Sequence, residues 1–315
     1  MISAVTADSV TQSAQAEGAE LDVSVVLPIF NEVEHLEAEI DRIKAALDAS
    51  QYSYEIICVD DGSTDGSSER LATIDGVRLI RFLRNHGSGT ARKVGTRNAR
   101  GRVTVWTDVD MTYPNDQIPQ LVKELEGADQ VVGARTSEQG SHKAFRVPAK
   151  WFIRRLACYL TQTNIPDLNS GFRAFRTNVA RQFLNQLPRG FSCVTTITMT
   201  FLANGYSVRY VPIDYATRAG TSKFHWWRDT RRYFAQVVRM VLSYNPLRVF
   251  MPVGLGLLLI GAVKLGYDLV DKDFRVATNT LVVLLTAFQV VMIGLLADLM
   301  VRLNKPRDEI EPAQL

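Results

Sequence analysis

The sequence predicts an α/β domain with a mainly parallel sheet, followed by interfacial amphipathic helices and a C-terminal two-helix transmembrane hairpin. Three observations indicate this architecture. Short apolar runs alternate with segments of helical periodicity through the first half of the chain. Two long stretches near the C-terminus carry almost no charge. Basic residues mixed with aromatic ones precede these two stretches.

Composition and charge narrow the class of protein. A hydrophobic content of 46% and a charged content of 22% indicate a globular chain, and 315 residues can hold one large domain, or one domain plus an appendage. The net charge of +3 is too small to indicate binding to nucleic acid. Residues 1–20 are small and polar and lack the apolar core of a signal peptide, so we expect a disordered tail and a cytosolic N-terminal part.

The cysteines predict neither disulfides nor zinc. Cys58, Cys158 and Cys193 show no CxxC spacing, and each has apolar neighbours. We therefore expect buried thiols in a reducing compartment.

Five apolar runs are expected to be strands: residues 22–27, 54–60, 77–83, 102–108 and 129–135. Helical patterns lie between them, at residues 32–49, near Glu69, at 90–99 and at 116–126. In the first of these patterns apolar side chains recur at helical spacing, at Val33, Leu36, Ile40, Ile43 and Leu47. Strands that alternate with helices form a parallel, doubly wound sheet with right-handed crossovers.

Polar loops follow all five predicted strands. Because ligands of such sheets bind beyond the carboxyl ends of the strands, these loops should meet at one edge and form a nucleotide site. Local alternatives remain open for the first two loops. Asn31 and Glu32 also suit the N-terminus of a helix, and residues 59–65 also suit a surface turn with a cap at Ser63 or Asp65.

The third loop belongs to "RNHGSGTARKVG" at residues 84–95, where glycines bracket the start of a helix. This geometry favours anions. The chain contains no Walker GK[ST] motif, and no GxGxxG follows the first strand. These absences weaken a dinucleotide-binding interpretation.

The fourth loop, "DVDMTYP" at residues 108–114, begins with two aspartates one residue apart. Residues i and i+2 of a strand face the same way, so Asp108 and Asp110 can direct two carboxylates at one point. Mg²⁺ or Mn²⁺ takes one or two carboxylates together with phosphate oxygens. A bound diphosphate with its cation would therefore resolve the repulsion between the two like charges.

Residues 249–270 and 276–297 each have the length and apolar character of a membrane-spanning helix, and residues 271–275 form a short turn between them. The alternative is a pair of buried helices in a soluble core. Lys264 is the weak point of the first stretch, although a lysine near a helix end can extend to the interface. The positive-inside rule places both ends in the cytosol, because basic residues flank the hairpin at Arg239, Arg248, Arg302, Lys305 and Arg307.

Two stretches mix bases with aromatic residues, at 143–160 and 223–244. We expect them to lie in the membrane interface, with bases toward lipid phosphate and rings in the acyl boundary. Soluble-core helices are the alternative. Nucleic-acid binding uses similar residues, but the transmembrane segments argue against it.

Six motifs stand in order along the chain: "VVLPIFNE", "VDDGSTDGS", "RNHGSGTARKVGTRNARG", "WTDVDMTYP", "DLNSGFRAFRT" and "RAGTSKF". In this order they resemble the motifs of family 2 glycosyltransferases, and more narrowly those of the polyprenyl-phosphate glycosyltransferases such as dolichyl-phosphate mannose synthase and its bacterial undecaprenyl-phosphate counterparts. The likeness covers residues 22–303 and includes the hairpin. It implies a GT-A, Rossmann-like catalytic domain.

The resemblance implies a donor site for a GDP- or UDP-linked sugar, with Asp108 and Asp110 as a DxD motif that holds Mg²⁺ or Mn²⁺. We predict that these motifs contact the nucleotide sugar through Pro28, Phe30, Asn31, Glu32, Asp60, Asp61, Gly87, Lys93, Asp108 and Val109. The chain departs from many relatives at two positions. Ser88 stands where a lysine is frequent, and Thr112 stands where a glutamine is frequent.

An acceptor site is implied by two further motifs, at residues 165–180 and 217–224. Its predicted phosphate ligands are Ser170, Arg173, Arg218, Ser222 and Lys223. Arginine suits this role because its planar fork donates hydrogen bonds in pairs. The alternative for each base is a contact with anionic lipid head groups.

The implied reaction is inverting transfer of a sugar from a nucleotide diphosphate sugar to a polyprenyl phosphate, giving a lipid-linked donor for cell-envelope or protein glycosylation. Asp108, Asp110, Arg173 and Arg218 are the predicted catalytic residues. A phosphate monoester is mostly ionised near neutral pH, so no strong base is needed. The alternatives are a processive polysaccharide synthase, whose QxxRW motif this chain lacks, and a non-catalytic membrane scaffold.

The predicted organisation follows from these assignments. The parts are a tail at 1–20, a catalytic domain at 21–220, an interfacial helix at 221–245, the hairpin at 246–303 and a cytoplasmic tail at 304–315. We expect an integral protein of the cytoplasmic membrane whose catalytic domain faces the cytosol. Expected partners are the nucleotide sugar, the polyprenyl phosphate and the bilayer, without nucleic acid, and homo-oligomerisation is left open.

Overall fold

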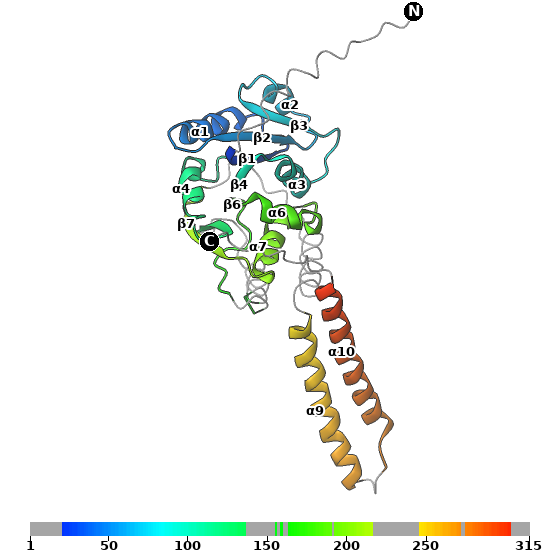
Figure 1. The fold of residues 1–315 in the computed structure, drawn as a ribbon. Helices are drawn as coiled ribbons and strands as arrows, with labels where there is room; N and C mark the ends of the chain where they lie inside the picture. The colour runs from blue at the N-terminus through cyan, green and yellow to red at the C-terminus, as the bar shows by residue number, and fades with distance from the viewer. Residues whose placement is uncertain are drawn as a thin grey trace, which may run out of the picture.

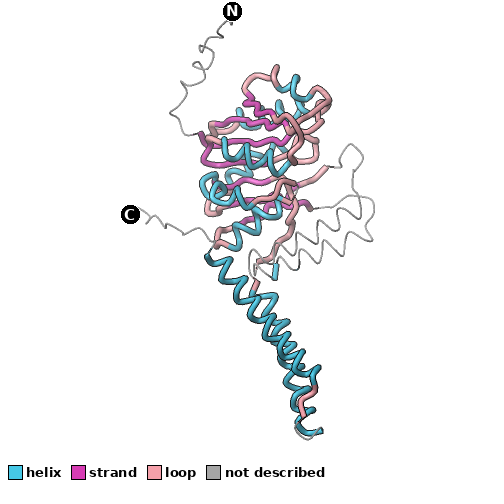
Figure 2. The backbone as a smooth tube through the Cα atoms, turned by 90° about the vertical axis from the view of Figure 1, so that its right-hand side faces the viewer, coloured by secondary structure: helices cyan, strands magenta, loops and turns pink. Residues whose placement is uncertain are grey.

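A seven-stranded sheet forms the centre of the catalytic domain, with helices on both faces (Figures 1 and 2). The computed structural model describes residues 21–136, 155, 158–159, 163–190, 192–216, 246–271 and 275–303. The strand order is β3-β2-β1-β4-β6-β5-β7. The strands are β1 (Leu21–Ile29), β2 (Tyr54–Asp60), β3 (Val77–Arg81), β4 (Gly101–Trp106), β5 (Gln130–Arg135), β6 (Arg173–Arg176) and β7 (Val208–Ile213).

The five predicted strands are confirmed as β1 to β5, and all five run in the same direction. β1 pairs in parallel with β2 and β4, and β2 pairs in parallel with β3. β6 lies antiparallel between β4 and β5, and β7 adds to β5 in parallel. The sequence analysis did not predict β6 or β7. β6 has only four residues, with an arginine at each end, which is too short for a reliable strand pattern.

Eight helical segments lie among the described residues of this domain. They are α1 (Leu36–Asp48), α2 (Ser67–Leu71), α3 (Ser88–Asn98), η2 (Asn115–Gln117), α4 (Ile118–Lys123), α6 (Thr177–Phe183), η3 (Leu184–Gln186) and α7 (Cys193–Ala203). One core cluster unites the sheet with α1 and α4, and a second unites its other face with α3, α6 and α7. The sheet is therefore covered on both faces, as a doubly wound fold requires.

α1 begins four residues later than its apolar pattern suggested. Leu36, Ile40, Ile43 and Leu47 are fully buried against the sheet, as the helical spacing predicted. Val33 precedes the helix and is 37% exposed. The difference arises because the backbone amides of residues 31–33 donate hydrogen bonds to the loop after β2 and to the start of α2 instead of entering α1.

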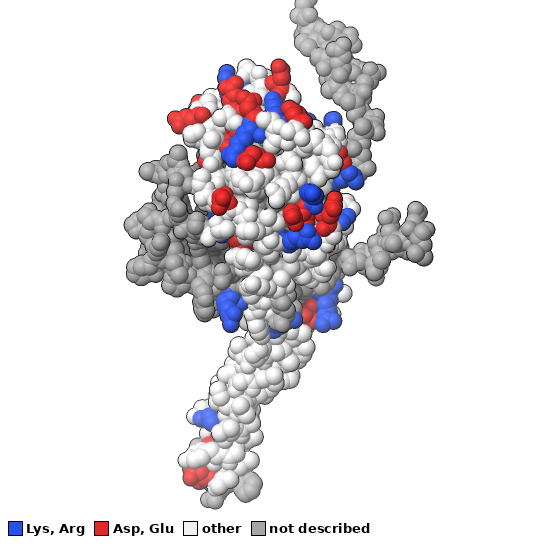
Figure 3. All heavy atoms as spheres, turned by 90° about the vertical axis from the view of Figure 1, so that its left-hand side faces the viewer, with Lys and Arg blue, Asp and Glu red and all other residues white. Residues whose placement is uncertain are grey.

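α9 (Leu247–Asp271) and α10 (Thr278–Leu303) form an antiparallel hairpin that extends away from the sheet domain (Figure 1). Each is long and apolar enough to cross a membrane. Most of their large apolar side chains are exposed, among them Leu259 and Val263 at 67%. A soluble-core hairpin would bury them, so that alternative is wrong. Figure 3 shows a hairpin surface almost without charge between its two ends.

The two helices of the hairpin contact each other through residues seven positions apart. Gly254, Gly261 and Asp268 are buried on α9, and Thr280, Ala287 and Gly294 are buried on α10. A Cβ on Gly254 would lie 2.5 Å from a methyl carbon of Val291, so the small residues allow the backbones to approach. This spacing is that of two helices packed at a small crossing angle.

The buried Asp268 caps the second helix of the hairpin. Its Oδ2 accepts a hydrogen bond from the backbone N–H of Ala277, at 3.0 Å, and one from the Thr280 hydroxyl, at 2.5 Å. These groups stand at the start of α10, where the first amides have no partner within the helix. The carboxylate therefore fixes one end of the hairpin from the neighbouring helix.

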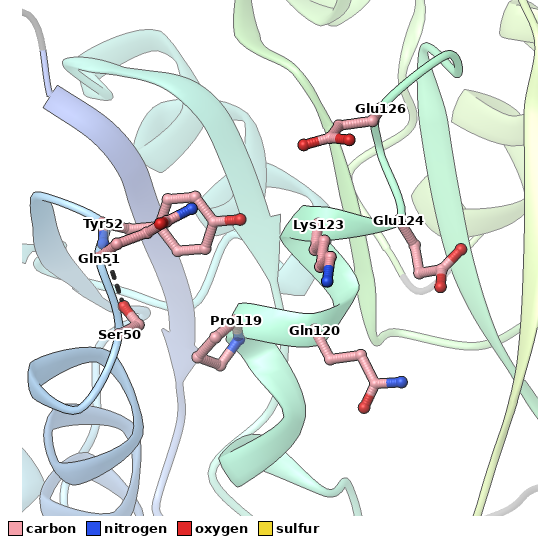
Figure 4. A pocket seen from close by; sticks show the side chains of 8 residues that line it. All are labelled: Ser50, Gln51, Tyr52, Pro119, Gln120, Lys123, Glu124 and Glu126. Atoms are coloured by element: carbon pink, nitrogen blue, oxygen red, sulfur yellow. Dashed lines mark hydrogen bonds between the residues drawn. The ribbon is translucent and has the colours of Figure 1, made fainter.

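An open groove lies at the edge of the sheet opposite the predicted site (Figure 4). Its lining comes from residues just before β2 and from the α4 segment that leads to β5, so it faces the amino ends of these strands. Ligands of doubly wound sheets bind at the other edge. The lining residues are Ser50, Gln51, Tyr52, Pro119, Gln120, Lys123, Glu124 and Glu126.

Candidate active site

The loops after β1 and β2 are bonded to each other. Asn31 has a left-handed backbone, with φ of 57°, and its Oδ1 accepts a hydrogen bond from the backbone N–H of Thr64 at 2.9 Å. In return, the Asn31 amide donates to the hydroxyl of Ser63 at 3.1 Å. The next amide, that of Glu32, donates to Ser67 Oγ. The Asn31 side chain therefore bonds the second loop and does not cap α1. In the second loop it is Asp65, not Ser63, whose carboxylate accepts from the amide of Ser67 at the start of α2, at 3.0 Å.

Asp61 joins the second loop to the third. Its carboxylate accepts hydrogen bonds from the backbone amides of His86, at 2.6 Å, and Gly87, at 2.8 Å. Burial raises the pKa of Asp61, although these two hydrogen bonds oppose the shift. The carboxylate thus takes the place of an anion at the start of α3.

Its neighbour Asp60 is fully buried and points elsewhere. Oδ1 accepts a hydrogen bond from the Ser63 amide at 2.9 Å. Oδ2 accepts none from the described residues and lies 3.9 Å from the Nε of Arg81. Asp60 is therefore the carboxylate of the second loop that retains hydrogen-bonding capacity.

The start of α3 packs against the chain at residues 187–190. A Cβ on Gly89 would lie 2.4 Å from the carbonyl oxygen of Pro188, so this contact requires glycine. The Thr90 amide donates to the carbonyl of Arg189 at 3.0 Å, and the Lys93 ammonium donates to that of Leu187 at 3.0 Å. Together with Asp61, this segment occupies the helix N-terminus that the sequence suggested for an anion.

The two aspartates after β4 have separate partners. Asp108 Oδ1 lies 2.5 Å from the Nη2 of Arg92, a residue of α3 that is almost fully buried. Asp110 Oδ1 accepts a hydrogen bond from the Thr112 hydroxyl at 2.5 Å. Met111, between Asp110 and Thr112, has a φ of 60°, which a residue with a Cβ adopts only under strain. Thr112, the departure noted in the sequence, thus orients the second aspartate.

A buried network of polar side chains holds the loop after β4 in place. The Asn115 amide nitrogen donates to the backbone carbonyl of Asp108 at 3.1 Å and to the carboxylate of Glu39. Its amide oxygen accepts a hydrogen bond from Thr107 Oγ1 at 2.5 Å. Arg42 pairs with Glu39 at 3.3 Å. Sequence reasoning missed this network, although an acidic residue beside the buried stripe of α1 was a possible signal.

The segment before β6 lies directly against Asp108. A Cβ on Gly171 would lie 2.9 Å from Asp108 Oδ2, 3.2 Å from the Tyr113 hydroxyl and 3.3 Å from Arg92 Nη2. The Gly171 amide donates to the Tyr113 hydroxyl at 2.7 Å. Burial raises the pKa of Tyr113. The structure therefore brings the predicted acceptor motif to the predicted metal-binding loop.

Arg173 has an internal position in this structure. Its guanidinium donates to the carbonyl of Ser170, to the carbonyl of Val194 at 2.7 Å and to the hydroxyl of Thr198 at 2.8 Å. Burial lowers the pKa of Arg173 to about 10. Ser170 is also buried, and its hydroxyl accepts a hydrogen bond from the Phe172 amide. Direct contact of either side chain with a phosphate stays a prediction.

Asp167 and Arg135 form a two-bond ion pair beside this segment. Arg135 donates from Nε at 2.6 Å and from Nη2 at 3.0 Å, and its guanidinium stacks 5.2 Å from the ring of Tyr215. Burial alone would raise the pKa of Asp167, but the hydrogen bonds and charge of Arg135 lower it. The pair ties the end of β5 to the approach to β6.

The remaining predicted residues are placed as follows. Phe30 is 42% exposed, Pro28 is partly buried and the Val109 side chain is buried. Arg218, Ser222 and Lys223 lie outside the described residues, as do most of 143–160 and all of 221–245 and of both predicted tails.

The residues present fit a divalent ion that is shared with a ligand. Among the described residues, no three His, Cys, Asp or Glu side chains are grouped to hold a metal. Two carboxylates, Asp108 and Asp110, are the usual contribution of a protein to Mg²⁺ or Mn²⁺ when phosphate oxygens and water complete the coordination.

Two protein-family models match the chain. "Glycosyl transferase family 2" matches residues 24–184, and "GtrB C-terminal hairpin" matches residues 245–303. The match to the hairpin family and the two apolar helices together indicate a membrane protein.

Among similar proteins, the undecaprenyl-phosphate 4-deoxy-4-formamido-L-arabinose transferase of Aeromonas hydrophila subsp. hydrophila is 32% identical over 242 residues, which cover 74% of this chain and 71% of the relative. The protein of the same name from Yersinia pestis (strain Pestoides F) is 32% identical over 248 residues, which cover 76% of this chain and 73% of the relative.

Solved structures confirm the GT-A prediction at the level of the fold. Glucosyl-3-phosphoglycerate synthase from Mycobacterium tuberculosis, in complex with phosphoglyceric acid, has a TM-score of 0.57 at 22% identity and covers 70% of this chain and 80% of its own. The complex of the same enzyme with Mn²⁺, uridine-diphosphate-glucose and phosphoglyceric acid has a TM-score of 0.56 at 21% identity. This match covers 70% of the present chain and 79% of the neighbour. By its sequence, its fold and the order of its motifs, the chain belongs to glycosyl transferase family 2.

Proposed function

We propose that the protein transfers a sugar from a nucleotide diphosphate sugar to a polyprenyl phosphate, with inversion at the anomeric carbon. The observation that carries the proposal is the combination, in one chain, of the Asp108–Asp110 site with a GtrB-type hairpin. The similar proteins from Aeromonas and Yersinia are named as undecaprenyl-phosphate sugar transferases, which supports a polyprenyl phosphate as acceptor.

The donor site is formed by the loops after β1, β2 and β4. Asp60 retains hydrogen-bonding capacity for the nucleoside, and the exposed Phe30, which follows Ile29, the partner of Asp60 in the pairing of β1 with β2, offers an aromatic surface. Asp108 and Asp110 would hold Mg²⁺ or Mn²⁺, which stabilises the charge that develops on the departing diphosphate. The Mn²⁺ and UDP-glucose complex of the structural neighbour supports this assignment.

The acceptor reaches the site from the membrane. Its phosphate is already mostly ionised near neutral pH, so the protein has to align it rather than deprotonate it. We assign this alignment to Arg218, Ser222 and Lys223, and to the segment at residues 170–173, which lies against Asp108. In this assignment Arg173 supports the segment from inside by bonding the Ser170 carbonyl.

The topology follows from the same proposal. Basic residues flank both ends of the hairpin, so we place the catalytic domain and the C-terminal tail in the cytosol, at the cytoplasmic membrane. Residues 143–160 and 221–245 would lie at the membrane surface beside the site. The domain boundaries at 220 and 245 belong to this proposal.

Transfer into lipid tests the function. Purified protein is incubated with a radiolabelled UDP- or GDP-linked sugar, Mn²⁺ or Mg²⁺, and undecaprenyl phosphate, and the mixture is extracted with organic solvent. We expect label in a lipid that mild acid hydrolyses. UDP-4-deoxy-4-formamido-L-arabinose is the first donor to try, since it corresponds to the names of the similar proteins. A long water-soluble polymer without labelled lipid would instead indicate a processive synthase.

A further inference from the structure

Arg92 is a buried cation for which the sequence analysis found no role. It lies on α3 with 2% of its side chain exposed, and its Nη2 is 2.5 Å from Asp108 Oδ1. We propose that Arg92 is a positioning residue that fixes the Asp108 carboxylate and lowers the negative charge of the site, so that the divalent ion binds together with the nucleotide rather than before it. The inference rests on the proposed function.

The guanidinium of Arg92 is enclosed on two sides. Its central carbon lies 5.8 Å from the centre of the Trp106 ring, and its Nη2 lies 3.3 Å from the position of a Cβ on Gly171. Its Nε and Nη1 are buried and have no nitrogen or oxygen partner among the described residues. Asp108 is thus the ion-pair partner that the structure gives to this charge.

A buried arginine that has one ion-pair partner among the described residues is costly for folding. Removing a guanidinium from water is unfavourable unless ion pairs and hydrogen bonds replace the lost solvation, and an apolar side chain over Trp106 would avoid the penalty. The position therefore serves something other than packing. We assign it to the orientation of Asp108. The Asp108 carboxylate is held on one side by Arg92 Nη2 and is confined on the other by the close approach of Gly171.

The charge of Arg92 has a second effect. Asp108 and Asp110 alone would present two negative charges to a cation, whereas with Arg92 the same group carries a net charge of −1. A divalent ion is then held weakly by the protein alone. The diphosphate of the donor adds negative charge and phosphate oxygens, which raise the affinity for the ion. Binding of ion and nucleotide is therefore coupled.

Titration of Mn²⁺ followed by electron paramagnetic resonance tests the inference on full-length protein in detergent, with Mn²⁺ alone and with UDP or GDP. In the wild type, we expect weak binding of Mn²⁺ alone and strong binding with one of the nucleotides. In Arg92→Gln, Mn²⁺ alone should bind at least about fivefold more tightly, since a neighbouring unit positive charge repels even a singly charged cation by about this factor in water. A purely structural defect would weaken binding instead.

Two further variants separate charge from geometry. Arg92→Lys keeps the charge, so its affinity for Mn²⁺ alone should stay near the wild-type value, while kcat should fall at least about tenfold because an ammonium lacks the planar fork. The matched control is Arg97→Gln on the same helix. Arg97 is exposed, and its guanidinium donates a hydrogen bond to Asn185 Oδ1 at 3.2 Å. Arg97→Gln should change neither the affinity for Mn²⁺ alone nor kcat.

The results that would overturn the role of Arg92 differ from those that would overturn the proposed function. If Arg92→Gln stays folded and binds Mn²⁺ alone no more tightly than the wild type, the inference is wrong. If Arg92→Gln does not fold, Gly171→Ala decides, since its Cβ would displace Asp108 Oδ2 with the charge of Arg92 intact. Unchanged kcat in Gly171→Ala overturns the positioning role. If the wild type binds no Mn²⁺ with either nucleotide, the proposed metal site itself fails.

Discussion

The carboxylate of Asp61 lies 2.8 Å from the backbone nitrogen of Gly87, and this bond joins the loop after β2 to the first turn of α3. Its other oxygen accepts from the amide of His86. The protein thus fills its own anion position at this helix with a side chain. Asp61→Asn should destabilise the fold by about 1–2 kcal/mol, because an amide offers only one acceptor oxygen to two donors.

Chemical denaturation of Asp61→Asn measures this loss. Asp41→Asn is the control, since Asp41 is an exposed aspartate on α1. Equal unfolding free energies for Asp61→Asn and the wild type would show that the two amide bonds contribute nothing to stability.

Removal of the metal should abolish transfer. EDTA is expected to stop formation of labelled lipid, and Mn²⁺ or Mg²⁺ in excess should restore it, because the diphosphate leaves poorly without a cation. Asp110→Ala should lower kcat at least about 100-fold and should not respond to added metal. Activity that persists in EDTA, or in both Asp108→Ala and Asp110→Ala, would contradict the metal assignment.

The pair of Asp167 with Arg135 should make stability depend on pH. The pKa of Asp167 is lowered in the folded state, so its contribution is present above its ordinary value of 3.8 and is lost as the pH falls below that value. Asp167→Asn should therefore be less stable than the wild type at pH 7, and the difference should shrink toward pH 3. Thermal unfolding across this range is the measurement, and a difference independent of pH would refute the assignment.

Gly89 should not tolerate a side chain. The Cβ of Gly89→Ala would meet the carbonyl oxygens of Pro188, at 2.4 Å, and Gly190, at 2.6 Å, so the start of α3 would have to move. We expect a loss of about 1–3 kcal/mol in unfolding free energy. Gly190→Ala is the matched control, since a Cβ there meets no atom of the described residues within 4 Å and the backbone is not left-handed. Similar losses in both variants would contradict the packing argument.

Asp268 should be needed for the hairpin. Asp268→Ala leaves the Ala277 amide and the Thr280 hydroxyl without their acceptor, at an expected cost of about 1–3 kcal/mol. Thermal unfolding in detergent, with Asp271→Ala at the exposed end of α9 as control, measures it. If both variants unfold at the wild-type temperature, the cap does not stabilise the hairpin.

The sequence predicted the elements that have strong periodicity, namely β1 to β5, the stripe of α1 and both helices of the hairpin. It also predicted that Asp108 and Asp110 follow a strand. The sequence did not reveal which polar side chains form hydrogen bonds within the protein and which remain available to a ligand. Asp60 and Asp61 are adjacent and of one type, yet one bonds the third loop and the other keeps a carboxylate oxygen without a hydrogen bond from the described residues. Only tertiary placement distinguishes them.

Arg92 illustrates the same limit. In "GTARKVG" it reads as one base of a polar helix, and no periodicity marks it as buried. Its burial follows from the position of α3 on the sheet, above Trp106, and its partner is sixteen residues away. β6 was hidden for a different reason, because its pairing with β4 and β5 depends on contacts far apart in the chain.

The antiparallel direction of β6 has a consequence for how such enzymes diversify. β5 ends at Arg135, and β6 begins at Arg173, which pairs with Val132 near the same end of β5. The chain between them leaves and re-enters the scaffold at one place. Its length and sequence can therefore change without altering any strand pairing. The fold separates a fixed frame, to which Asp167 and Gly171 belong, from an exchangeable insert, and chimaeras that swap residues 137–162 between relatives should keep the sheet.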